Sequence, residues 1–101
     1  MRSYRELGLQ FVLEKIDKIE RYLFLKTKSD FMKSQLLQDA VLLNLQLVSE
    51  NLIRLNFDKS KVFSRAIYDY YNPNLDLTWK ITKFELLELK KKVKRDFEVF
   101  R

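Results

Sequence analysis

The segment from Leu36 to Leu55 constrains the fold of this chain more than any other feature. Twelve of its twenty residues are apolar, and on a helical wheel they occupy nearly the whole circumference. A helix that is apolar all round is normally buried on most sides. In a chain of 101 residues, this predicts a helix at the centre of the fold that also contributes to a subunit interface.

One polar line interrupts this apolar helix. It consists of Asp39, Gln46 and Glu50, whose spacings of seven and four residues keep them on one face. In one interpretation the line faces solvent or the polar groups of a partner, and in the other it faces a functional cleft. The sequence leaves both interpretations open.

The rest of the chain is also predicted to be helical. It contains one Gly and one Pro, whereas a β-rich chain of this length would need more of these turn residues. Apolar residues at helical spacing predict helices over residues 4–25, 31–55, 59–71 and 77–100. Ser29 or Asp30 is expected to cap the second helix, Asp58 the third and Asp76 the fourth. We therefore predict an all-α, up-and-down four-helix bundle, formed as a single domain by residues 1–101.

The composition excludes several classes of chemistry. The chain has no cysteine and no histidine, which rules out disulfides, thiol catalysis, the usual zinc sites and histidine-based acid–base catalysis. No carboxylate cluster indicates magnesium, so we expect neither a metal nor a cofactor. No apolar segment resembles a signal peptide or approaches the roughly 18 residues that span a bilayer. A soluble, cytoplasmic chain without membrane contact is the expectation.

The net charge of +6 favours a polyanionic partner, such as RNA or an acidic protein. The densest basic run is Lys90-Lys91-Lys92, followed by Lys94 and Arg95, on the last predicted helix. Such runs are usually a solvated helix face, and phosphate binding is the alternative.

Two segments resemble a known family. The first spans residues 38–50, where Gln-Asp-Ala begins the helix and is followed by Asn-Leu, an apolar pair, a small residue and Glu. The second is Tyr-Asp-Tyr-Tyr at 68–71, followed by Leu-Asp-Leu-Thr-Trp at 75–79. In this order and spacing they resemble the HepT-like toxins of the HEPN superfamily, over about residues 8–95. The resemblance implies all-helical dimers whose paired motifs form a composite cleft, which in many members is a metal-independent ribonuclease.

The resemblance also implies a partner and a set of site residues. The usual partner is a minimal nucleotidyltransferase that acts as antitoxin and in some systems transfers AMP to the tyrosine of the motif. Tyr70 aligns with that tyrosine and is the candidate for modification, the alternative being an ordinary, partly buried tyrosine. By analogy with the family, Asp39, Glu50 and Asp69 are expected to line the cleft.

The chain departs from the family motif at two positions that matter for catalysis. Phe63 stands where the family has an arginine, and Tyr68 stands where it has a histidine. Tyrosine, with a pKa near 10, is a poor base at neutral pH, and phenylalanine cannot bind a phosphate. Arg65 could supply the cation, but on a helix it lies about 200° from Phe63, and an ion pair with Asp69 is its other interpretation. The catalytic candidates are therefore Arg65, Tyr68 and Tyr70.

Three functions remain open at this point, and the sequence does not decide whether the chain is an enzyme. The favoured one is a degenerate HepT-like protein that binds RNA or a nucleotidyltransferase without cutting RNA. The second is an active endoribonuclease toxin that uses altered residues. The third is a plain helical dimerisation or adaptor module.

Overall fold

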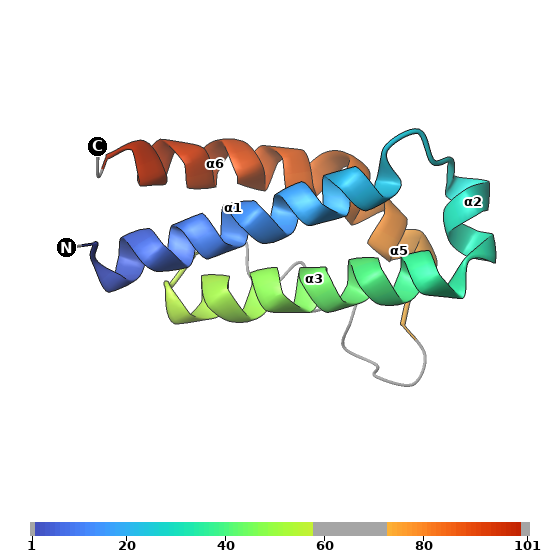
Figure 1. Ribbon diagram of the computed structural model, residues 1–101, viewed down its shortest axis with the longest axis horizontal. Helices are drawn as coiled ribbons and strands as arrows, with labels where there is room; N and C mark the ends of the chain where they lie inside the picture. The colour runs from blue at the N-terminus through green and yellow to red at the C-terminus, as the bar shows by residue number, and fades with distance from the viewer. Residues whose placement is uncertain (1, 58–72, 100–101) are drawn as a thin grey trace.

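The computed structural model describes residues 2–57 and 73–99 (Figure 1). Within these residues the regular structure is entirely helical. The elements are α1 (Tyr4–Leu23), α2 (Lys28–Lys33), α3 (Gln35–Arg54), α5 (Leu75–Lys80), the π-helix η1 (Ile81–Glu85) and α6 (Leu86–Glu98). The predicted all-α class is thereby confirmed. The helix predicted over residues 59–71 lies outside the described residues.

The first helix is the centre of the arrangement. It packs against both α3 and α6 and runs antiparallel to each of them (Figure 1). The short helices α2 and α5 lie together at one end of the molecule, and the start of α1 and the end of α6 lie at the other end. These directions agree with an up-and-down bundle.

The core follows the helical spacing of the sequence. On α1 the buried residues recur every three or four positions, as predicted: Leu9, Val12, Ile16, Ile19 and Leu23. They pack in one cluster with apolar residues of α3 and of the last helices, among them Val41, Leu45, Val48, Leu52, Ile81, Leu86, Leu89 and Val93. Phe31 of α2 closes the end of this core, with its ring centroid 5.6 Å from that of Trp79.

The helix α3 is less completely covered than its composition predicts. Its apolar side chains in the core cluster are fully buried, whereas Leu36, Leu43 and Ile53 are 80%, 56% and 54% exposed. In the chain by itself, one face of this apolar helix therefore lies open to solvent.

The second predicted helix is in fact two helices, because two separate caps begin them. Thr27 caps α2: its Oγ1 accepts from the Asp30 backbone N–H at 3.1 Å, and Asp30 Oδ2 accepts from the Thr27 backbone N–H at 2.8 Å. In this reciprocal capping box Asp30 acts from the third helical position, so the prediction of Ser29 or Asp30 as the N-cap is wrong. Ser34 then adopts an extended backbone and caps α3 by accepting from the Leu37 N–H at 3.1 Å.

Two other helix ends also differ from the prediction. Asn74, not Asp76, caps α5, because Asn74 Oδ1 accepts from the Leu77 N–H at 3.0 Å. Asp76 lies within the first turn and forms a 2.7 Å ion pair with Lys28 of α2. The first helix ends at Leu23, two residues early, and Leu25 adopts the left-handed region with φ of 59°, which a right-handed helix cannot continue through.

A π-helical turn joins α5 to α6. The N–H of Leu86 donates to the carbonyl of Ile81, five residues back. Its wide turn places Ile81 and Thr82, adjacent in the sequence, in buried positions and leaves Phe84 70% exposed. Apolar spacing predicts one regular helix here, so this turn was not expected. Short π-helical turns of this kind are rare and occur frequently at functional sites.

Candidate functional site

The predicted polar line of α3 lies at the protein surface. Asp39 and Glu50 are exposed, and Gln46 is partly exposed. Each carboxylate accepts a hydrogen bond from a glutamine four residues earlier: Gln35 Nε2 donates to Asp39 Oδ1 at 2.7 Å, and Gln46 Nε2 donates to Glu50 Oε1 at 3.2 Å. Both carboxylates are therefore held on the helix surface, where a partner or a ligand can reach them.

The exposed apolar residues of α3 lie on the same face as this polar line. Together they form a surface that we call the α3 outer stripe: Leu36, Asp39, Leu43, Gln46, Glu50 and Ile53. The steps between successive members are three and four residues, which is the spacing of a seam between packed helices. The stripe therefore offers apolar area for burial against another helix and includes two carboxylates.

The other predicted site residues cannot be placed on this surface. Phe63, Arg65, Tyr68, Asp69 and Tyr70 lie outside the described residues. Their roles in catalysis, in the cleft or in modification by AMP remain predictions.

Gln38, the residue that begins the Gln-Asp-Ala segment, has a structural position that the sequence did not reveal. Its side chain is only 9% exposed. Its Nε2 donates to the carbonyls of Phe31 and Met32, at 3.0 and 3.1 Å. This amide joins the end of α2 to the start of α3, while the next residue, Asp39, is exposed. A glutamine within a largely apolar helix was the only signal of this role.

The positive charge of the chain is concentrated on the last helices. Residues 80–95 contain seven Lys or Arg and two Glu, which gives +5, and the other 85 residues contain thirteen basic and twelve acidic residues, which gives +1. Lys90 is held in part by Glu20 of α1, with Nζ 2.6 Å from Oε1. The predicted basic run is therefore a feature of one region of the protein surface.

The described residues offer no metal site, since they contain no group of three or more Asp or Glu side chains placed to hold an ion. Over the same residues, no helix is both long enough and apolar enough to cross a membrane.

Comparison with known proteins identifies the family. The family model for ribonuclease HepT-like proteins matches residues 12–65, which is more than half of the chain. A protein of Methanocaldococcus jannaschii named "Gamma-glutamylcyclotransferase and putative RNase MJ0434" is 28% identical over 110 aligned positions, which cover 97% of this chain and 50% of that protein. The chain thus spans about half the length of this relative, and no solved structure matches it. From the family match, together with the all-helical fold, the chain belongs to the HepT-like ribonuclease family of the HEPN superfamily.

Proposed function

We propose that this chain is a HepT-like protein with a degenerate ribonuclease site, which binds RNA or a minimal nucleotidyltransferase without cutting RNA. The observation that carries the proposal is the pair Phe63 and Tyr68, at the positions of the family arginine and histidine. Metal-free RNA cleavage needs a base, an acid and a cation at the phosphate. Phenylalanine supplies none of these, and tyrosine at neutral pH is almost fully protonated.

Ribonuclease assays on matched variants test this proposal. The purified wild type and Phe63→Arg/Tyr68→His are incubated with labelled RNA over a broad pH range, with Phe63→Arg and Tyr68→His alone as single-site controls. We expect no cleavage by the wild type and cleavage by the double variant. Cleavage by the wild type at the rate of the double variant would refute the degenerate site.

Active cleavage with altered residues is the second candidate, because the name of the Methanocaldococcus jannaschii relative includes "putative RNase". On this hypothesis Arg65 supplies the cation and Tyr68 or Tyr70 takes part in proton transfer. Wild-type cleavage that is lost in Arg65→Ala and in Tyr68→Phe would support it. Equal cleavage by all three proteins would point to a contaminating nuclease.

A homodimer completes the proposed site, and the α3 outer stripe supports it. Pairing of two stripes would bury Leu36, Leu43 and Ile53, each of which is more than half exposed in the single chain. The same pairing would bring Asp39 and Glu50 of both copies to a shared cleft. There their role would be to orient the side chains of the motif by hydrogen bonding.

The proposed protein partner is a minimal nucleotidyltransferase that acts as antitoxin, with Tyr70 as the acceptor of AMP. Membership of the HepT-like family supports this pairing, and the motif tyrosine is retained although the arginine and histidine are not. Intact mass after co-expression with such an enzyme tests it. We expect one added AMP on the wild type and on Tyr68→Phe, and none on Tyr70→Phe. Addition to all three proteins would place the modification elsewhere.

A further inference from the structure

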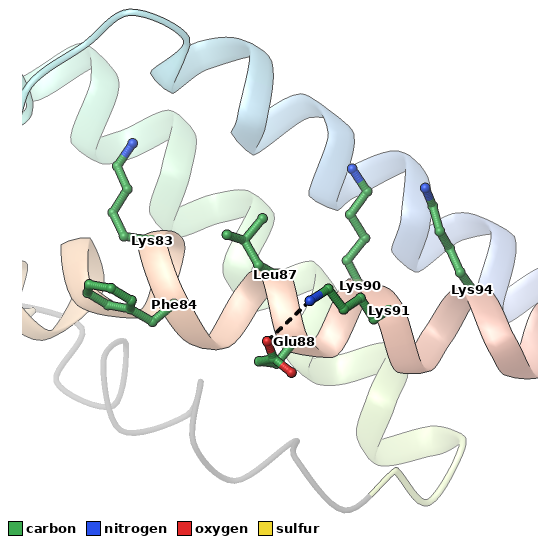
Figure 2. A pocket seen from close by; sticks show the side chains of 7 residues that line it. All are labelled: Lys83, Phe84, Leu87, Glu88, Lys90, Lys91 and Lys94. Carbon is green, nitrogen blue, oxygen red and sulfur yellow. Dashed lines mark ion pairs between the residues drawn. The ribbon is translucent and has the colours of Figure 1, made fainter.

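A groove with both basic and aromatic walls lies along η1 and α6. It has a volume of about 470 Å³. Figure 2 shows Lys83, Leu87, Lys90 and Lys94 projecting to the same side of the helix, with Phe84 near one end. Lys91 completes the wall and forms a 3.5 Å ion pair with Glu88. These lysines belong to the sixteen residues that carry +5 of the net charge of +6.

The lysines of the groove are available to an anion to different degrees. The ammonium of Lys90 is shared with Glu20, and that of Lys83 lies 4.6 Å from the centroid of the Trp79 ring. Lys94 is exposed and forms no ion pair with any described residue. Because exposed lysine pairs contribute little stability, a phosphate can replace Glu88 at Lys91 at small cost.

Two exposed aromatic rings accompany these cations. Phe84 is 70% exposed in the π-helical turn, and Phe24, just beyond the end of α1, is 71% exposed. Phe24 lines a second hollow of about 290 Å³ that shares Lys83 and Leu87 with the first, so the two hollows form one continuous surface. Burial of these rings would be favourable, because it removes apolar area from water. Exposed apolar groups of this size are typical of binding surfaces.

Exposed aromatic rings beside flexible lysines match the chemistry of a single-stranded nucleic acid. Bases stack on aromatic rings whatever their sequence, and the lysines follow the phosphates. An acidic protein would satisfy the charges but would need no exposed rings beside them. A rigid duplex presents its phosphates rather than its base faces.

We propose that the surface formed by Phe24, Lys83, Phe84, Leu87, Lys91 and Lys94 binds single-stranded RNA, with bases on the two phenylalanines and phosphates on the lysines. This inference makes the proposed function more specific, and it rests on the alternative in which the chain binds RNA. It assigns RNA capture to one face of η1 and α6, whose residues are distinct from those of the α3 outer stripe.

Fluorescence anisotropy of labelled oligouridylate RNA with the full chain tests this assignment. Phe84→Ala is expected to weaken binding about fivefold or more, from the loss of one stacked base. Lys91→Ala/Lys94→Ala is expected to lower the slope of log K against log salt by about 0.7 per lysine. Matched controls are Tyr4→Ala, which removes a ring that is 71% exposed on α1, and Lys33→Ala/Arg54→Ala, which removes two exposed charges elsewhere. Tyr4→Ala is expected to keep the wild-type affinity, and the charge control the wild-type salt slope.

Other outcomes would overturn the assignment in distinguishable ways. In one such outcome the wild type binds RNA, and Phe84→Ala, Lys91→Ala/Lys94→Ala and the controls all bind it with the same affinity and salt slope. This surface is then not the RNA site, although the proposed function stands. If the wild type binds no RNA and the lysine variant instead loses a nucleotidyltransferase, the surface docks a protein. These experiments measure RNA binding and not RNA cleavage. Their failure can therefore be distinguished from failure of the cleavage tests at Phe63 and Tyr68.

Discussion

The guanidinium of Arg5 lies 3.0 Å from the carboxylate of Asp96, which joins the first and last helices across 91 positions of sequence. Its second terminal nitrogen donates to the carbonyl of Leu55 at 2.9 Å, and the group lies 5.7 Å from the centroid of the Phe57 ring. One side chain of α1 therefore contacts the ends of both α3 and α6.

Replacing Arg5 by methionine tests this three-helix contact. The change keeps an aliphatic side chain and removes the charge-assisted hydrogen bonds. The side chains of Arg5 and Asp96 are 42% and 45% exposed. We expect the free energy of unfolding to fall by about 1 kcal/mol, measured by urea denaturation. Arg21→Met is the matched control, since its ion pair with Asp17 is more exposed and lies within one helix, and it should cost about 0.3–0.5 kcal/mol. Equal losses in the two variants would show that the contact across helices adds nothing.

Gln38 is predicted to stabilise the junction between α2 and α3. In Gln38→Met the side chain keeps its length, but the carbonyls of Phe31 and Met32 lose their amide donor. We expect a loss of about 1 kcal/mol in the free energy of unfolding, because both carbonyls lose a hydrogen bond and the Phe31 carbonyl keeps only the one from the Ser34 N–H at 3.3 Å. Gln35→Met, which removes a surface hydrogen bond to Asp39, should change stability by less than about 0.5 kcal/mol. A neutral Gln38→Met would contradict this structural role.

The proposed dimer predicts a strong effect at the middle of the α3 outer stripe. Each dimer would bury two copies of Leu43, so Leu43→Asp should raise the dissociation constant at least about a hundredfold, as measured by analytical ultracentrifugation. The control is Leu25→Asp, at a leucine that is 84% exposed and lies off the stripe. It should leave the dissociation constant unchanged. A wild type that stays monomeric at every concentration, or an unaffected Leu43→Asp dimer, would exclude this interface.

The capping and cross-helix carboxylates predict a loss of stability in acid. The Thr27 backbone N–H and hydroxyl, hydrogen-bonded to Asp30, hold the pKa of that carboxyl below its usual value, and the Lys28 ammonium does the same for the pKa of Asp76. A carboxyl with a lowered folded-state pKa contributes stability that is fully present above its unfolded pKa, near 4. That contribution is lost as the pH falls from about 4 through the folded-state pKa.

Urea denaturation of the wild type and of Asp30→Asn/Asp76→Asn at pH 5 and at pH 3 tests this sign. The difference in stability between the two proteins should be largest at pH 5 and smaller at pH 3, because protonation removes the charge from the wild type as well. A difference that stays constant between the two pH values would show that these carboxylates do not titrate with folding.

Much of the fold could be predicted from local patterns. The buried positions of α1 from Leu9 to Leu23 follow directly from helical spacing, and the scarcity of Gly and Pro correctly indicated long helices. The caps were harder, because Thr27, Ser29 and Asp30 can all accept from free N–H groups, and only the backbone path selects among them. The π-helical turn was missed because its apolar residues keep a spacing that also fits an ordinary α-helix.

The candidate site was predictable only in part. The face shared by Asp39 and Glu50 follows from their positions along one helix, and the structure places both on the surface. Gln38, one residue earlier, has the same polar character but is buried, because the carbonyls of Phe31 and Met32 face it across a turn. No pattern in the sequence brings these carbonyls to Gln38.

The all-helical class, the family and the absence of histidine and cysteine chemistry follow from residue spacing and residue identity, which are local properties of the chain. Which apolar residues of α3 stay exposed, and which rings lie beside the lysines of α6, became clear only from the packing of the helices. Both depend on how neighbouring helices cover a given face, as α1 covers one side of α3. The contact of Arg5 with Asp96 is likewise a feature of the tertiary structure, since residues so far apart in the sequence meet only when the helices pack.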